Sequence, residues 1–228
     1  MKKNQFLFLL VLILSTTLSA QDVCTAYLPA KGTTLTYNNY DKKGKLTNTT
    51  TTEVVSIIQD GDSKIFKVHQ LISDGKKKND IENNFKYICT GDQFIVDMQS
   101  ILNAEQMQGF TGTVVIETEN MFIPKNLEPG MELEDGLIKM EAYVEPMTMT
   151  IMARSFYREV IAKEEITTPA GTFEAWKIGG NIETKVSFMR FAARTVEWYV
   201  EDIGIVRSEM YDNKGKMYGY SELVKISK

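Results

Sequence analysis

Hydrophobic and polar residues alternate with a period of two through most of this chain, and short polar segments separate the alternating runs. Leu35 and Tyr37 share one face of the first run, Lys45 to Ile58 continues as a long threonine-rich run, and Ile138 and Met140 share a face further on. Such alternation places successive side chains on opposite faces of a β-strand. The pattern therefore predicts a mainly β protein.

Tight turns are expected between these strands. Pro169 and Gly171 supply the restricted φ and the positive φ that a short hairpin turn between Thr168 and Gly171 needs. The repeats Y-D-K-K-G-K at Tyr40 to Lys45 and Y-D-N-K-G-K at Tyr211 to Lys216 predict two equivalent hairpins. Long strands joined by tight turns favour one curved antiparallel sheet, forming a half-barrel or open barrel.

One segment breaks the alternation. Within Asp97 to Gly109, the residues Met98, Ile101 and Leu102 fall near one side of a helix, with Asp97 as the N-cap. We expect one or two helices on the concave side of the sheet, this one being the best candidate. It is either a packing helix that does not move or a lid, with Met98, Ile101 and Leu102 as the lid candidates.

The first residues have the layout of a secretory signal peptide. Lys2 and Lys3 precede the apolar run Phe6 to Leu14, and small residues lead to Ala20. We expect cleavage after Ala20, so that residues 21–228 form a single β-rich periplasmic or secreted domain that does not span a membrane. Cys24 lies too far from the expected cleavage site for lipid anchoring.

Charge and cysteine content narrow the classes further. Without Lys2 and Lys3, residues 21–228 carry 24 basic and 30 acidic residues, a net charge of −6. This balance argues against a nucleic-acid partner. Cys24 and Cys89 are an even pair in an oxidising compartment, which predicts a disulfide between them, with two free buried thiols as the alternative. Two cysteines and one histidine without ligand spacing predict no metal site.

Longer motifs that combine turns with aromatic residues carry a family resemblance. T-P-A-G-T-F begins at Thr168, W-Y-V-E-D-I-G-I-V-R begins at Trp198, and Y-D-N-K-G-K begins at Tyr211. In the other half, L-P-A-K-G-T-T-L-T-Y begins at Leu28 and I-P-K-N-L-E-P-G begins at Ile123. With these motifs the chain resembles the TapB-like family of exported proteins of uncharacterised function. The resemblance implies a β-rich envelope protein similar in architecture to the LolA and LolB lipoprotein carriers, and it implies no catalytic residues.

The sequence contains no recognisable catalytic constellation. His69 is the only histidine, and its neighbours in the strand pattern indicate a half-exposed strand residue rather than a base. There is no nucleophile elbow, phosphate loop or dinucleotide fingerprint, so we expect no catalytic residues and no cofactor. A pair of convergent acidic or polar residues in a deep pocket would revive an enzymatic function.

Methionine and aromatic residues provide the ligand-lining candidates. M-T-M-T-I-M places Met147, Met149 and Ile151 on one face of a strand. These three side chains either fill the core, form a pliable wall for an apolar ligand, or, with a third sulfur, bind Cu(I) through Met147 and Met149. Phe188 and the neighbours Trp198 and Tyr199 either line a cavity or fill it. The full set of candidates is Met147, Met149, Ile151, Phe188, Trp198 and Tyr199.

Together these features favour a non-enzymatic exported protein that binds an apolar ligand, such as a lipid or a lipoprotein acyl chain, in its curved sheet. The alternative is an interaction or scaffold protein of the cell envelope whose concave face is a filled core, with an envelope protein as its partner. Cu(I) binding through Met147 and Met149 is the lesser alternative. The first two differ in whether the sheet encloses an apolar cavity.

Overall fold

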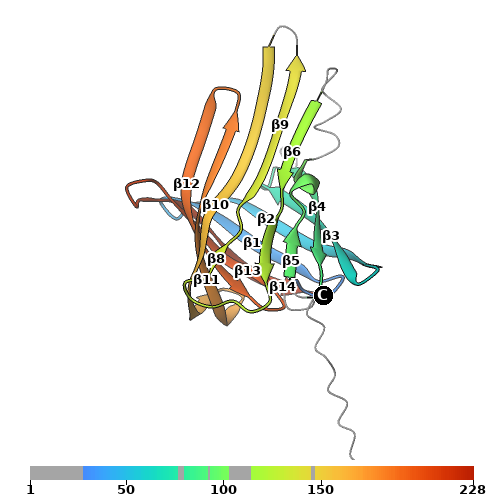
Figure 1. Cartoon of the computed structure of the whole chain (residues 1–228). Coiled ribbons are helices and arrows are strands. Elements are labelled where there is room, and N and C mark those ends of the chain that lie inside the picture. Colours follow the sequence, from blue (N-terminus) through green and yellow to red (C-terminus); the bar gives the residue numbers. More distant parts are fainter. Residues whose placement is uncertain (1–27, 77–79, 92, 103–113, 145–146) are drawn as a thin grey trace, which may run out of the picture.

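The computed structural model describes residues 28–76, 80–91, 93–102, 114–144 and 147–228, without the side chains of Val144 and Met147. In these ranges the chain forms β-strands, short turns and one 3-10 helix, and no α-helix occurs among them. All of the strands belong to a single sheet (Figure 1).

The strands range from two to 22 residues in length, and every recorded pairing is antiparallel. The bounds of the elements are β1 Thr34–Asp41, β2 Leu46–Asp60, β3 Ser63–Ser73, β4 Ile81–Cys89, β5 Gln93–Val96, η2 Met98–Ile101, β6 Val114–Glu119, β7 Met121–Pro124, β8 Glu132–Leu133, β9 Gly136–Val144, β10 Met147–Thr168, β11 Gly171–Val186, β12 Met189–Val200, β13 Gly204–Tyr211 and β14 Met217–Ser227.

The order of the strands brings the two edges of the sheet together. Neighbouring strands run β6-β9-β10-β11-β12-β13-β14-β1-β2-β3-β4-β5-β7, and β8 pairs with β10 outside this path. Only Asn120 separates the end of edge strand β6 at Glu119 from the start of edge strand β7 at Met121. A sheet whose edges are joined through one residue has to curl through almost a full turn. The 14-stranded sheet is therefore nearly closed into a barrel, and the predicted curved antiparallel sheet is confirmed.

The two repeated turn motifs form equivalent hairpins, as the sequence predicted. Asp41 Oδ1 accepts hydrogen bonds from the backbone N–H groups of Lys43 at 2.8 Å and Lys45 at 3.0 Å. Asp212 accepts the corresponding two bonds, both at 2.8 Å. The glycine that closes each turn has a φ of +74° in the first hairpin and +78° in the second. These backbone hydrogen bonds hold the pKa of both aspartates below its ordinary value.

Strands β9 to β12 form two hairpins that project beyond the rest of the sheet at one end (Figure 1). In the first, β9 pairs with the beginning of β10, from Met147 to Ser155. In the second, β11 pairs with β12 up to a turn at Ser187, whose backbone N–H donates to the Thr150 carbonyl at 2.7 Å. The two hairpins are therefore tied together near the tip of the second.

Buried apolar residues of the larger core cluster come from distant parts of the sheet. Val54 on β2 and Phe66 on β3 pack in one cluster with Val160, Ile178 and Tyr199 from β10, β11 and β12. These strands lie on opposite sides of β13, β14 and β1 in the strand order. Their side chains meet because the sheet curls around its own interior.

A second cluster lies where the turn between β10 and β11 meets β14. Leu35, Trp198, Val206 and Leu223 are buried in it. The backbone N–H of Ala170, in the turn, donates to the Leu223 carbonyl at 3.3 Å. The predicted Pro169 hairpin is thus present and also closes one end of the fold.

The predicted helix at Asp97 to Gly109 requires a correction. Asp97 does act as the N-cap, since its side chain accepts from the Gln99 N–H at 3.1 Å, but the described part is the four-residue 3-10 turn η2. Leu102 is already extended, and the Met98 N–H donates to the Asn120 side chain at 3.0 Å, which anchors η2 at the junction of β6 and β7. Residues 103–113 lie outside the described residues. No helix within the described ranges is long and apolar enough to cross a membrane.

Candidate functional site

The interior of the barrel contains a cavity of about 500 Å³. A barrel of eight strands is just wide enough for its own side chains to fill, and this sheet has more strands than that. The space that remains lies between β1–β5 on one side and β10–β12 on the other. Its volume falls within the range of small-molecule binding sites.

Most of the cavity wall is apolar. Aliphatic and aromatic side chains from both sides of the barrel contribute to it, and threonine, serine and amide side chains occupy a part of the wall. The apolar residues that line the cavity are Leu28, Pro29, Leu35, Val54, Val68, Phe85, Phe94, Val96, Met121, Ile123, Ile178, Ile182, Ile203 and Ile205.

One acidic side chain points into this cavity. Glu197 lies on β12 and lines the cavity. In the strand register its neighbours are Ile178 of β11 and Ser208 of β13. No described residue forms a hydrogen bond or an ion pair with its carboxyl group. Burial raises the pKa of this carboxyl group above its ordinary value of 4.5, although the charge of Arg158 acts in the opposite direction. Glu197 is therefore an acid that retains its proton to higher pH than an ordinary glutamate.

A buried arginine shares the cavity with Glu197. Arg158 is 7% exposed and lies on β10, and its Nη1 donates to the backbone carbonyl of Glu134 at 3.0 Å. Burial lowers the pKa of its guanidinium group, while the charges of Glu197 and Asp135 raise it. Arginine remains protonated in proteins, so the cavity contains one fixed positive charge. Four of the five guanidinium N–H groups are left without a hydrogen bond to a described residue.

A bulge in β10 directs the arginine inward. The pairing of β10 with β11 is interrupted between Phe156 and Glu159, and Tyr157 has a φ of +51° with its side chain 77% exposed. Bulges next to functional sites re-aim side chains in this way. Gly180 on β11 makes room, because a Cβ atom there would lie 3.2 Å from Arg158 Cγ. The inward guanidinium thus depends on a strained tyrosine and on a glycine.

Tyrosine hydroxyls add neutral polar groups to the same wall. Tyr37 on β1 and Tyr87 on β4 both line the cavity. Burial raises the pKa of Tyr87 to about 12, with a further contribution from the negative charge of Glu197, and it also raises the pKa of Tyr37. Both phenols therefore stay protonated at neutral pH. The site combines an apolar body with one cation, one weak acid and hydroxyl donors.

Of the six predicted lining residues, five have described side chains, and one of these five lies at this cavity. Tyr199 lines it, whereas Met149 and Ile151 lie on the projecting part of β10 and pair with β9. Phe188 lies at the tip of the β11–β12 hairpin and is 92% exposed. The side chain of Met147 is outside the described residues, so the predicted Cu(I) site at Met147 and Met149 stays a prediction.

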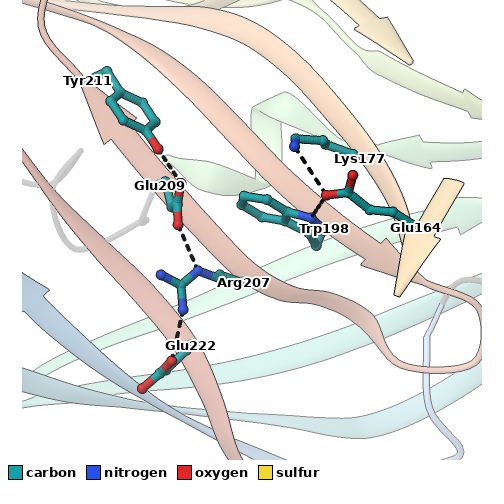
Figure 2. Close-up of polar contacts among 7 residues, drawn as sticks. All are labelled: Glu164, Lys177, Trp198, Arg207, Glu209, Tyr211 and Glu222. Atoms are coloured by element: carbon teal, nitrogen blue, oxygen red, sulfur yellow. Dashed lines mark hydrogen bonds and ion pairs between the residues drawn. The ribbon is translucent and has the colours of Figure 1, made fainter. Parts of the chain in front are cut away.

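Trp198 belongs to the second core cluster instead of the cavity (Figure 2). Its Nε1 donates to Glu164 Oε1 at 2.8 Å, and Lys177 Nζ lies 3.1 Å from the same oxygen. The two bonds lower the pKa of Glu164. Trp198 is therefore part of a polar and aromatic contact that supports the fold.

Of the lid and disulfide candidates, the structure describes Met98, Ile101, Leu102 and Cys89. Met98 is buried and Ile101 is exposed, with Leu102 half-buried at the end of η2. Cys89 is buried in the larger core cluster, at the end of β4. Cys24 lies outside the described residues, so its pairing with Cys89 stays a prediction.

His69 is a half-exposed strand residue, as its sequence pattern indicated. Its Nε2 lies 3.5 Å from Glu82 Oε2 on the neighbouring strand. Within the described ranges, no group of three or more histidine, cysteine, aspartate or glutamate side chains is placed to hold a metal ion.

Another charged network, on β13 and β14, is internally satisfied (Figure 2). Arg207 bridges Glu209 at 2.8 Å and Glu222 at 3.1 Å, and Tyr211 donates its hydroxyl proton to Glu209. The Arg207 guanidinium also lies over the Tyr220 ring, 4.7 Å from its centre. Because these groups have partners in one another, we regard the network as structural.

Sequence reasoning missed both charged residues of the cavity. In R-T-V-E-W-Y-V, Glu197 occupies the same alternating face as Tyr199, so an acid stands at an inward position. The sequence contains that signal, but it does not show which face of the strand turns inward. Arg158 has no comparable signal, because the bulge at Tyr157 shifts the alternation just before it.

Comparison with known proteins gives a family and a fold. The model of the family described as DUF3108-like matches residues 30–223. A crystal structure described as a "putative exported protein with YmcC-like fold", from Bacteroides fragilis NCTC 9343, is 23% identical, with a TM-score of 0.69 over 89% of this chain and 99% of its own. A "putative lipoprotein" from Parabacteroides distasonis ATCC 8503 is 21% identical, with a TM-score of 0.67 over 88% of this chain and 97% of its own. No curated protein matches the chain.

Proposed function

This chain belongs to the DUF3108-like family, and on that premise we propose that it is an exported, non-enzymatic protein that binds an apolar ligand inside its barrel. Lipids and lipoprotein acyl chains are the ligand class. The family resemblance to TapB-like proteins and the architectural likeness to the LolA and LolB carriers belong to the same proposal. The descriptions of the two similar crystal structures as an exported protein and a lipoprotein are consistent with it.

The observation that carries the proposal is the apolar cavity of about 500 Å³ within a nearly closed sheet. A scaffold protein with a filled core has no need of such a space. Shielding an acyl chain from water is favourable by about 0.8 kcal/mol for each buried methylene group. A chain of ten or more methylenes would therefore gain several kcal/mol, after the cost of ordering the ligand.

The proposal can be tested on protein purified from the periplasm without detergent. Native mass spectrometry measures the mass of any bound ligand, and organic extraction with lipid analysis then identifies it. Thr52 lines the cavity, and Thr51 precedes it on β2 and points to the opposite face of the sheet. Thr52→Trp should obstruct the cavity, and Thr51→Trp is the matched control. We expect a stoichiometric lipid in the wild type and in Thr51→Trp, and its loss in Thr52→Trp.

Two results of this experiment would contradict lipid binding in the cavity. A clean ligand-free mass, with no lipid taken up from liposomes, would overturn the binding function. The envelope scaffold with an unidentified protein partner would then be the better proposal. Retention of the lipid by a folded Thr52→Trp variant would instead place the lipid outside this cavity.

A second candidate function is enzymatic, and Glu197 is the observation that favours it. An acid that lines a cavity and has a raised pKa is a common general acid or base. We rank it below binding because no described nucleophile or second acid lies in hydrogen-bond contact with Glu197. Chemical change in a bound lipid during incubation, abolished in Glu197→Gln, would reverse this order.

A further inference from the structure

We propose that the ligand of the cavity is a single-chain amphiphile with one negatively charged carboxylate head, which is held between Arg158 and Glu197. This inference rests on the proposed binding function and adds the chemistry of the ligand head. Three observations support it: the charges in the wall, the free hydrogen-bonding capacity of both groups, and the size of the cavity.

The charges in the wall favour an anionic head. Among the described residues that line the cavity, Arg158 and Glu197 are the only charged ones. Burial favours the neutral form of the Glu197 carboxyl group, whereas the Arg158 guanidinium stays charged, so the fixed charge in the cavity is positive. A cationic head would be repelled by this charge, and a neutral head would leave it unpaired in an apolar space. A carboxylate pairs with it in the bidentate geometry that arginine favours.

The hydrogen-bonding capacity of the two groups fits the same head. Arg158 donates one bond to the Glu134 carbonyl and has further N–H groups available. No described residue bonds to the Glu197 carboxyl group, which as a protonated acid can donate to a carboxylate oxygen. A buried polar group without a partner costs free energy, so a ligand that satisfies both groups binds with a corresponding gain. The two groups lie on β10 and β12, on either side of β11.

The size of the cavity favours one acyl chain over two. A volume of about 500 Å³ falls in the range of sites that take one small molecule, roughly 300–1,000 Å³, and a single acyl chain is a ligand of that size. The tail would lie along the aliphatic wall formed by residues such as Val68, Ile178 and Ile182. A diacyl phospholipid exceeds this space.

The experiment compares ligands with one tail and three heads: hexadecanoate, hexadecanol and hexadecylammonium, each titrated into lipid-stripped wild-type protein below its micelle concentration. We expect hexadecanoate to bind at least about ten-fold more tightly than hexadecanol and hexadecylammonium to bind weakest. In Arg158→Met, the preference for hexadecanoate over hexadecanol should disappear. Phospholipid vesicles should not saturate the cavity.

Glu197→Gln separates the role of the proton from that of the charge. Hexadecanoate affinity should fall in the wild type as pH rises and Glu197 loses its proton, and this fall should be absent in Glu197→Gln. The other titratable or charged groups near Glu197 are Arg158 on β10, Tyr87 on β4, and Asp135 beside Arg158. Tyr87, with a pKa of about 12, does not titrate in the neutral range.

The outcomes separate this inference from the proposed function. Equal binding of all three ligands, or tightest binding of hexadecylammonium, would overturn the anionic head and leave apolar binding intact. Failure of all three ligands to bind would overturn the proposed function itself. If Arg158→Met does not fold, the head-group series on wild-type protein and the pH dependence of Glu197→Gln still decide the matter.

Discussion

Arg158 and Glu197 line the same cavity from strands β10 and β12, with β11 between them, and neither has its full set of hydrogen-bond partners among the described residues. Buried charged groups in proteins are normally paired. An incompletely paired cation and acid within an otherwise apolar space are therefore the part of this fold that a ligand would complete.

The stability of the ligand-free protein should depend on the ionisation of Glu197. Its pKa is raised in the folded state above the ordinary value of 4.5. The folded protein therefore binds this proton more tightly than the unfolded chain does, and stability falls as pH rises from about the unfolded value through the folded one. Glu197→Gln should remove this loss. Urea unfolding of both proteins over a pH series measures it, and parallel pH profiles would show that Glu197 ionises as an ordinary acid.

The strained backbone at Tyr157 should be relieved by glycine. Tyr157 has a φ of +51° and an exposed side chain, so Tyr157→Gly loses few contacts and should keep or raise the free energy of unfolding. Tyr157→Val should lower it by about 1–3 kcal/mol, because a β-branched residue is disfavoured at positive φ. Tyr143→Val, at another exposed strand position, is the control. Equal stability of the two Tyr157 variants would mean that this turn of the backbone relaxes in solution.

Removal of Arg207 should be costly because it leaves two acids side by side. Glu209 and Glu222 are 11% and 15% exposed at their side chains. Loss of one partner from a largely buried ion pair typically destabilises a protein by about 3–5 kcal/mol. Arg207→Met should approach this range, and adding Glu222→Gln should restore part of the loss. The exposed pair Lys163 and Glu174 provides the comparison, since Lys163→Met should cost no more than about 1 kcal/mol.

The predicted disulfide between Cys24 and Cys89 has a direct chemical test. Peptide mapping of the exported protein without reductant should recover the two cysteine peptides as one linked species. Cys24→Ser should lower the free energy of unfolding by about 2–4 kcal/mol, because a cross-link over this long loop restricts the unfolded chain. Complete alkylation of both cysteines in unreduced, unfolded protein would exclude the bond.

The hairpins were predictable because their determinants are local. Asp41 and Asp212 each bond to backbone N–H groups two and four residues away, so the motif carries its own geometry wherever it occurs. The strand periods follow from the pleat in the same way. The helix expected at 97–109 was predicted less well. The spacing of Met98, Ile101 and Leu102 does not indicate the distant Asn120 side chain that accepts the Met98 N–H and anchors η2.

The site was less predictable because it depends on which face of each strand turns inward and on which distant strands meet. Sequence alone indicated Tyr199, but it gave the methionines of β10 and the exposed Phe188 the same standing as lining candidates. It gave no reason to single out Arg158, whose inward direction follows from a bulge and from the space at Gly180 on the next strand.

The sequence by itself determined that this is a mainly β chain of long antiparallel strands joined by tight turns, because alternation and turn chemistry act over a few residues. Only the tertiary structure decided that β1 pairs with β14, that the edges β6 and β7 meet, and that a cavity remains inside. Those features depend on pairings between residues nearly two hundred positions apart, such as Thr34 and Ser227, and local patterns do not encode them. The same closure brings Arg158 and Glu197 into one apolar space, where burial changes their chemistry.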